Sequence, residues 1–243
     1  MPDRADSGWN MVDLHRYEEL VSEQHARYPS ITLPPEYAEL FETNTLQILV
    51  KLARYKFVAR ILKSNDDVLE VGSGTGMGAI FLAQHTRSVT GLEIKSHDYE
   101  AAVAVNRRQN VTFHHQSLYN FEPAHRQFNA VVSIDVIEHM PIEEGRRFVA
   151  ELALRCRDDG IVVIGSPSIH SYPYQSAYSR AAHIKCYDQK ELVELMDGYF
   201  GRTIAFSMND EIVHTGHPKL AWYYFVLGLM PRRPGRLTNA KLV

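Results

Sequence analysis

Cysteine is scarce in this sequence. Cys156 and Cys186 are the only two among 243 residues, and they form no Cys-x-x-Cys pair. Two such isolated thiols exclude a disulfide framework and a structural zinc site built on cysteine pairs. The first twenty residues also lack the apolar segment of a secretory signal. We therefore expect reduced thiols and a cytoplasmic protein.

Long apolar runs and an excess of charge are lacking as well. The longest apolar run, LAWYYFVLGLM at 220–230, is too short to cross a bilayer, which takes about 20 residues. Its aromatic and branched residues predict a buried strand instead. Lys and Arg number 26 against 29 Asp and Glu, a net charge of −3. Since a polyanion needs a positive surface, we expect no nucleic-acid partner. The short apolar run leads us to expect no membrane span.

What the sequence does contain is a regular alternation of strand and helix patterns. Short apolar runs predict strands, and apolar spacings of three and four residues predict helices. Strands that are apolar throughout and separated by helices are typical of a parallel sheet covered on both faces. The predicted strands are 67–72, 88–94, 111–116, 128–135 and 160–167. The predicted helices are 76–85, 98–108 and 142–156, with one or two more helices over 36–62.

The last third of the chain departs from this alternation. A long polar and aromatic loop, 166–187, precedes a helix that the pair Asp188 and Glu191 caps and that Gly201 ends. Two strands, 202–208 and 222–229, complete the chain, the last one antiparallel.

Together these patterns predict an α/β fold with a Rossmann-like, doubly wound sheet. The sheet has seven strands, mostly parallel with an antiparallel last strand, in a single domain over residues 1–243. Residues 1–62 are predicted to form a helical N-terminal cover and 63–243 the α/β core. Two loops, 166–187 and 208–220, are expected to close over the substrate.

A glycine-rich turn, LEVGSGTG, joins the first predicted strand to its helix. Glycines at 72, 74 and 76 let the backbone approach a ligand closely, and a helix N-terminus offers N–H groups. The dinucleotide pattern GxGxxG is not met from any of these starting points, because Met77, Ala79 and Phe81 stand where its third glycine belongs. The turn therefore favours a ligand other than a dinucleotide.

This turn resembles the first motif of the class I S-adenosylmethionine-dependent methyltransferases, in their small-molecule branch. The run DVIEH after the fourth strand is similar to the Glu-His pair of ubiquinone-type methyltransferases. The resemblance covers about residues 54–200 and implies S-adenosyl-L-methionine as cofactor. It implies that Glu70 lies near the amino end of the methionine moiety, that the glycine turn passes under the cofactor and that the end of the fourth strand faces the sulfonium. The residues expected to bind the cofactor are Glu70, Gly72, Ser73, Gly74, Thr75, Gly76, Glu93, Ile94, Ser117, Leu118, Asp135 and Val136.

Two of these assignments depend on strand ends. Glu93 ends the second strand, where a carboxylate can accept hydrogen bonds from both ribose hydroxyls. An oxidoreductase would share this acid, so it supports adenosine binding in general. The family often has an acid after the third strand; here Ser117 and the Leu118 backbone are the candidates for adenine contacts. Arg54 or Lys56 is a candidate partner for the cofactor carboxylate, or else a solvated helix charge.

The candidate catalytic residues are histidines. His139 follows the fourth strand and His183 ends the long loop, and either can act as a base or position a substrate. Each also has a structural alternative: His139 as a helix-start residue, and His183 as a loop residue in solvent. His214 and His217 lack a partner pair, so no metal site is predicted.

These features predict methyl transfer to the hydroxyl of a small molecule, with a sugar or glycan precursor as the first choice. The alternative within the class is N- or C-methylation of a quinone, phenol or other metabolite. From other classes, an NAD(P)-dependent oxidoreductase and a non-catalytic S-adenosylmethionine-binding module remain. The acceptor atom and the oligomeric state are not predicted.

Overall fold

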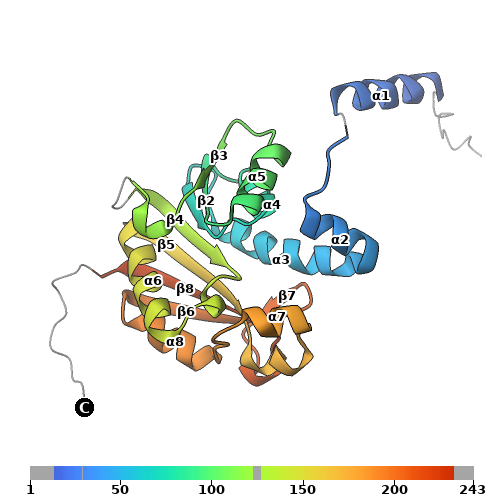
Figure 1. The fold of residues 1–243 in the computed structure, drawn as a ribbon. Helices are drawn as coiled ribbons and strands as arrows, with labels where there is room; N and C mark the ends of the chain where they lie inside the picture. The colour runs from blue at the N-terminus through green and yellow to red at the C-terminus, as the bar shows by residue number, and fades with distance from the viewer. Residues whose placement is uncertain (1–13, 29, 123–126, 233–243) are drawn as a thin grey trace, which may run out of the picture. The chain divides into compact units, whose positions relative to one another are not determined.

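The computed structural model describes residues 14–28, 30–122 and 127–232 of the chain. Eight strands form one sheet in the order β3-β2-β1-β4-β5-β8-β6-β7 (Figure 1). The α/β fold is therefore confirmed, with five parallel strands followed by antiparallel ones.

The elements follow the alternation of the sequence. The helices are α1 (Leu14–Arg27), α2 (Pro35–Thr43), α3 (Thr45–Ile61), α4 (Met77–Leu82), α5 (Ser96–Val105), α6 (Ile142–Arg155), α7 (Ala177–Ala182) and α8 (Gln189–Asp197). The strands are β1 (Asp67–Val71), β2 (Ser88–Glu93), β3 (Val111–His115), β4 (Phe128–Ile134), β5 (Cys156–Pro167), β6 (Phe200–Asn209), β7 (Ile212–His214) and β8 (Tyr223–Pro231).

The strand order reverses between β1 and β4, which are neighbours in the sheet but not in the chain. From β1 the chain continues outward to β2 and β3, and from β4 it continues to β5 on the other side. In open α/β sheets the crevice at the carboxyl ends of the strands, beside such a reversal, is where ligands bind. The ends of β1, β2 and β4 therefore locate the site.

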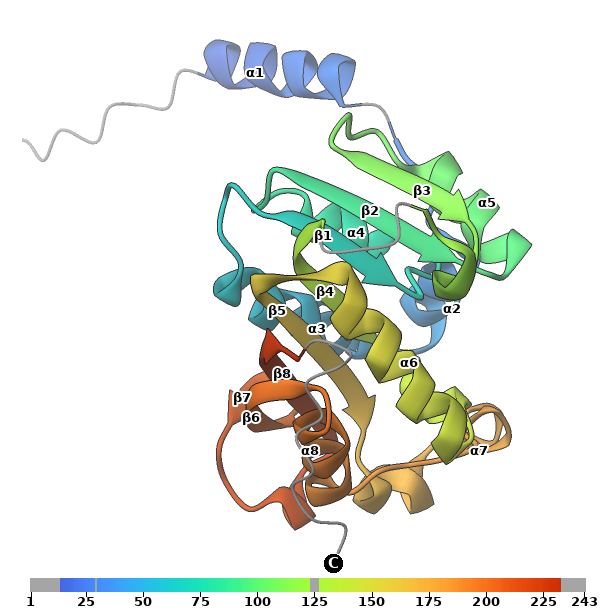
Figure 2. The ribbon, with the colours of Figure 1, turned by 90° about the vertical axis from the view of Figure 1, so that its left-hand side faces the viewer.

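Each face of the sheet has its own apolar core. Helices α6 and α8 cover one face, and α3 and α4 cover the other (Figure 2). On one face α6 and α8 contribute Phe148, Leu152 and Leu192, and on the other α3 and α4 contribute Val58 and Leu82. The central strands supply buried residues to both cores in alternation, because successive side chains point to opposite faces. This explains why the strands read as continuous apolar runs in the sequence.

The structure differs from the predicted elements in two places. The sheet has one strand more than the seven expected, since β7 adds a short edge strand antiparallel to β6. The segment 36–62, predicted as one or two helices, forms two, which Asn44 separates into α2 and α3. The helix after Asp188 ends at Asp197 with Gly198 following, and Gly201, predicted as its stop, lies inside β6.

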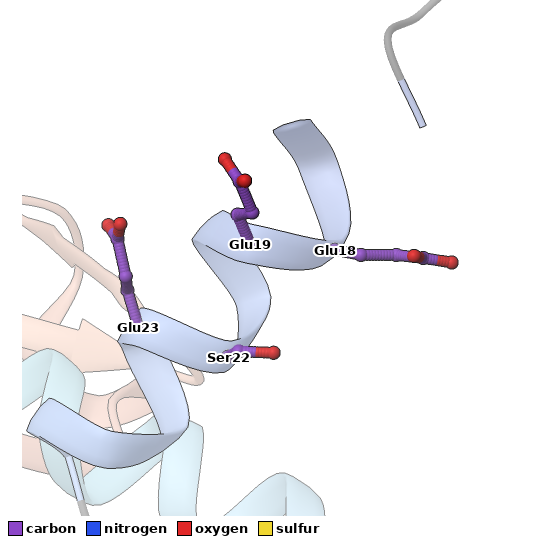
Figure 3. A pocket seen from close by; sticks show the side chains of 4 residues that line it. All are labelled: Glu18, Glu19, Ser22 and Glu23. Atoms are coloured by element: carbon purple, nitrogen blue, oxygen red, sulfur yellow. The ribbon is translucent and has the colours of Figure 1, made fainter. Parts of the chain in front are cut away.

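Residues 1–32 form a unit separate from residues 33–243, and α1 is its described helix. Glu18, Glu19, Ser22 and Glu23 project from α1, and a depression there is lined by these four residues (Figure 3). Arg16 pairs with Glu19 on the same helix. The single domain over 1–243 and the N-terminal cover remain predictions, and both extend into residues outside the described ranges. Along the described residues, no helix is both long enough and apolar enough to traverse a lipid bilayer.

Candidate active site

The glycine turn after β1 has a backbone that only glycine adopts readily. Gly72, Gly74 and Gly76 all have positive φ, at 77°, 50° and 84°. The N–H groups of Gly72 and Ser73 both donate to Leu92 O, at 2.9 and 3.0 Å, which ties the turn to β2. The turn is thus pre-shaped by the protein itself.

The glycines differ in what surrounds them. A Cβ on Gly72 would lie 2.3 Å from Val136 Cγ2, and one on Gly76 would collide with Phe113 and Ala102. A Cβ on Gly78 would lie 2.1 Å from the Tyr55 ring. Only at Gly74, among these four, does no described atom lie within 4 Å of an added Cβ. Packing explains the other three glycines, and the open space at Gly74 identifies where a ligand can approach the turn.

Ser73 and Thr75, the two polar residues between these glycines, are both buried. The Ser73 hydroxyl has no hydrogen-bond partner within the described chain. The Ser73 hydroxyl packs against Gly91, since a Cβ added to Gly91 would lie 2.9 Å from Ser73 Oγ.

Glu70 is the second-last residue of β1, two positions before Gly72, and is completely buried. Among the residues described, neither of its carboxylate oxygens has a hydrogen-bond partner. Burial raises the pKa of Glu70 to about 8; the Tyr55 hydroxyl lies close enough to offset part of this rise, although it makes no hydrogen bond of normal geometry to either oxygen. A buried carboxyl without partners is costly unless a ligand supplies them, so Glu70 fits a role in holding a positive group.

Glu93, at the end of β2, accepts three backbone N–H groups. Gly74 N donates to Oε2 at 2.8 Å, and Ile94 N and Lys95 N donate to Oε1, both at 2.9 Å. A carboxylate has about four lone-pair sites, so one remains for a ligand while these bonds persist. The neighbouring Ile94 side chain is exposed and can lie against a flat ring.

The segment after β3 carries Ser117 and Leu118, the predicted adenine contacts. Ser117 Oγ accepts the Tyr119 N–H at 3.3 Å and caps a short 3₁₀ helix, Leu118–Asn120. The Leu118 side chain belongs to the core, and its carbonyl accepts a bond from Arg155 Nη2 at 2.8 Å. The Leu118 carbonyl is therefore occupied by the protein.

Asp135 follows β4 with φ of 58°, a left-handed conformation that is uncommon outside glycine. Its Oδ2 pairs with Arg54 of α3, and the Arg54 guanidinium lies 4.1 Å from the centre of the Tyr223 ring. Burial would raise the pKa of Asp135, but the charges of Arg54 and Lys51 lower it below its usual value. Asp135 is thus held as an anion, and Arg54 is not a solvated helix charge, unlike the exposed Lys56.

Glu138 is a buried acid for which no role was predicted from sequence. Its side chain is completely buried, and burial raises its pKa to about 8. Oε2 accepts the Ser166 hydroxyl at 3.2 Å, whereas Oε1 has no partner in the part of the chain that is described. The Glu138 carbonyl accepts the N–H groups of Ile184 at 2.8 Å and Lys185 at 3.0 Å. These two bonds fix the end of the 166–187 loop beside β4.

This anchoring brings the two predicted catalytic histidines together. The rings of His139 and His183 pack edge to face with centroids 5.1 Å apart. His139 Nδ1 lies 2.9 Å from Ala182 O, and His183 Nδ1 lies 2.8 Å from Gln175 Oε1. Both partners are oxygens that only accept, so each Nδ1 carries the hydrogen and each Nε2 keeps a lone pair. Burial first, and then the neighbouring His139, lower the pKa of His183, which favours its neutral form.

These residues fit S-adenosylmethionine in two respects. The open space at Gly74 admits a ligand against the turn, and the unpartnered Glu70 carboxylate suits the ammonium of the methionine moiety. Glu93 has one acceptor site for a ribose hydroxyl. Such a cofactor supplies a methyl group on a positively charged sulfur. The assignments of Ser117 and Leu118 to adenine, and of Asp135 and Val136 to the sulfonium region, remain predictions.

Comparisons with known proteins agree with this site. The profile of the methyltransferase domain family matches residues 68–160, which include the glycine turn and the DVIEH run. A protein of Mycolicibacterium smegmatis, named as a probable S-adenosylmethionine-dependent methyltransferase, is 28% identical over 150 residues, 60% of this chain and 54% of its own length. A ubiquinone biosynthesis O-methyltransferase of Rickettsia canadensis is 27% identical over 101 residues, 41% of this chain and 42% of its own length. The matches thus span about half the length of these relatives.

A solved structure shares the fold. It is described as a SAM-dependent methyltransferase, possible histamine N-methyltransferase, from Thermotoga maritima, and it superposes with a TM-score of 0.62 at 16% identity. The superposition covers 89% of this chain and 98% of that one. The sheet order, the glycine turn and the family match agree: residues 68–160 match the methyltransferase domain family, within a chain that shares the fold of a SAM-dependent methyltransferase.

Proposed function

We propose that this protein transfers the methyl group of S-adenosylmethionine to a hydroxyl of a small molecule, with a sugar or glycan precursor as the acceptor. The observation that carries the proposal is the pair His139 and His183, with both Nε2 lone pairs available beside the carboxyl end of β4. An alcohol is a poor nucleophile until its proton is removed, and histidine is the commonest group for that task. A neutral amine is already nucleophilic, so methylation of an amine depends less on such a pair.

The chemical step is an in-line displacement. The acceptor hydroxyl gives up its proton, its oxygen forms a bond to the methyl carbon, and the bond from that carbon to sulfur breaks. S-adenosylhomocysteine leaves with a neutral sulfur. In this step His139 and His183 position or deprotonate the hydroxyl, and alignment within the closed site contributes much of the rate enhancement.

The surface around the loops supports a sugar as acceptor. Tyr174 and Trp222 are both exposed, and their rings lie 5.7 Å apart. Aromatic faces pack against the apolar faces of sugar rings, and their polar edges bind hydroxyls. Asp210 and Glu211, in the loop between β6 and β7, are charged groups that suit hydroxyl recognition. By contrast, Asn209 Oδ1 accepts the Trp222 N–H at 3.0 Å and so stabilises this loop.

A phenol or quinol hydroxyl is the second candidate acceptor. The similarity to the Rickettsia canadensis ubiquinone biosynthesis O-methyltransferase favours it. The proposal keeps residues 1–62 as a cover and the 166–187 and 208–220 loops as the acceptor side of a single domain. Both cysteines are unbonded and buried, which is consistent with the proposed cytoplasmic location.

The test is methyl transfer from labelled S-adenosylmethionine to a panel of sugar nucleotides, free sugars, phenols and amines. We expect label in a hydroxyl of the sugar group. His139→Ala and His183→Ala should each reduce the rate by about 10²–10⁴-fold with unchanged affinity for S-adenosylhomocysteine. His170→Ala, an exposed histidine of the same loop, is the control and should retain activity. Label found only in amines, or full activity in both variants, would refute the proposal.

A further inference from the structure

Three potential metal ligands from two distant parts of the chain meet at the carboxyl end of β4. Glu138, His139 and His183 each place one ligand atom so that all three atoms lie within 4.8 Å of one another. The two histidines are 44 positions apart in the sequence. They meet because the Glu138 carbonyl binds the loop at Ile184 and Lys185.

The hydrogen bonds of these histidines orient them as metal ligands. Metal-binding histidines nearly always donate the other ring N–H to an oxygen, which fixes the tautomer and the ring orientation. Here Ala182 O and Gln175 Oε1 hold the two Nδ1 atoms in this way. The Gln175 amide is itself oriented, because its Nε2 donates to Ser171 Oγ at 3.1 Å. Both Nε2 lone pairs are therefore pre-set for coordination.

The buried Glu138 carboxylate points to a bound cation independently of the two histidines. Its side chain is fully buried, and Oε1 has no hydrogen-bond partner among the residues that the structure describes. The Ser166 hydroxyl binds the other oxygen and orients the carboxylate. A buried carboxylate oxygen without a partner is costly to keep in a folded protein. A cation between Glu138 and the two histidines would satisfy it.

We propose that Glu138, His139 and His183 bind a divalent transition-metal ion such as Zn²⁺. Two imidazoles favour such a metal over Mg²⁺ or Ca²⁺, which prefer oxygen ligands. Two histidines and one glutamate are also a known set for catalytic zinc, with a position left open. The ligand atoms of one tetrahedral zinc lie roughly 3.4 Å apart, so binding draws the three side chains slightly closer together.

The open coordination position gives the ion a role in methyl transfer. This role rests on the proposed function. The ion binds the acceptor oxygen and lowers the pKa of its hydroxyl, whose proton passes to solvent water. The oxygen then forms its bond to the methyl carbon while the bond from that carbon to sulfur breaks. His139 and His183 thus act on the acceptor through the ion. An acceptor with two neighbouring oxygens, such as a sugar diol or a catechol, fits this arrangement best.

The test measures metal binding directly, without reference to activity. Chelator-treated full-length protein is titrated with Co²⁺, whose visible absorption reports nitrogen-rich coordination, and then with Zn²⁺ as competitor. We expect one equivalent of Co²⁺ per chain, displaced by Zn²⁺. His139→Ala, His183→Ala and Glu138→Gln should each weaken binding by roughly 100-fold or more, whereas His170→Ala should bind normally. Gln175→Leu keeps all three ligands and should weaken binding by about 10–100-fold, as a positioning residue.

Affinity for S-adenosylhomocysteine and circular dichroism show whether each variant is folded. If the variant of the buried Glu138 does not fold, the variant of the exposed His139 decides the test. Absence of Co²⁺ binding, or equal binding by His139→Ala and His183→Ala, would overturn the metal site. Methyl transfer at full rate by metal-free protein would overturn the role of the ion but leave the proposed function. Metal binding without transfer to any hydroxyl would retain the site and reject the proposed function.

Discussion

Glu70 shows how one buried residue links the cofactor site to stability. Its carboxyl group is completely buried at the end of β1, and burial raises its pKa to about 8 from an ordinary value of 4.5. The folded protein therefore binds a proton at this residue between these two pH values, where the unfolded chain has released it. Protonation of Glu70 favours the folded state, and this contribution is lost as the pH rises toward 8.

We predict that the free energy of unfolding depends on pH through Glu70. Its contribution is fully present below pH 4.5 and falls by about 1.4 kcal/mol per pH unit as the pH rises toward 8. Glu70→Gln, which cannot ionise, should remove this part of the dependence. Urea unfolding of both proteins from pH 5 to 8 measures it. Parallel curves for the two proteins would show that Glu70 is not the group responsible.

Gly74 is the glycine of the turn at which a ligand, and not packing within the protein, limits the size of a side chain. Its φ of 50° disfavours a side chain, but an added Cβ meets no described atom. We predict that Gly74→Ala destabilises the protein by about 1–2 kcal/mol and weakens S-adenosylhomocysteine binding by at least about tenfold, because the methyl group occupies space that the cofactor needs.

Thermal unfolding and calorimetry measure the two effects separately. Gly198→Ala is the control, since Gly198 has a right-handed backbone at the end of α8, and its affinity should not change. Unaltered affinity in Gly74→Ala would place the cofactor elsewhere.

At the scale of elements, the sequence was informative where the signals are local. Asp188 and Glu191 form the capping box that their spacing predicts, with Glu191 N donating to Asp188 Oδ1 at 2.8 Å. The apolar run at 220–230 was correctly assigned to a strand, because β8 lies between β5 and β6 and is buried on both sides. Such features depend on residues within one turn or one strand of each other.

The elements that were missed depend on contacts with other parts of the chain. β7 has only three residues and no apolar alternation, and it exists because β6 is long enough to pair with it. Gly201 was taken for a helix stop, yet the Gly198 position already ends α8 and the chain enters β6. Two helices over 36–62 were among the expectations, but the position of the break at Asn44 was not predicted, because Asn44 makes no side-chain cap.

At the scale of the whole molecule, the site is assembled from segments that the sequence does not relate. The glycine turn after β1 and Glu93 at the end of β2 could be located from the sequence, and Gly74 N donates to Glu93 Oε2. The ion pair of Arg54 with Asp135 and the Tyr223 ring above it could not, because α3, β4 and β8 meet only in the folded sheet. Glu138 could be read as part of a motif, but its burial and its contacts with the 166–187 loop come from the fold.

The N-terminal unit provides the last test. The buried hydrophobic residues of the described chain begin at Tyr37, and the side chains of α1 from Arg16 onward are almost all exposed. A helix of 14 residues is marginal by itself in water. We predict that a chain starting at Leu33 keeps the same urea midpoint and S-adenosylhomocysteine affinity. If residues 1–62 cover the acceptor, its KM should rise about tenfold or more, since the apolar and polar contacts of the cover are lost. Steady-state kinetics with the best acceptor measures the KM, and an unchanged value would remove residues 1–32 from the predicted cover.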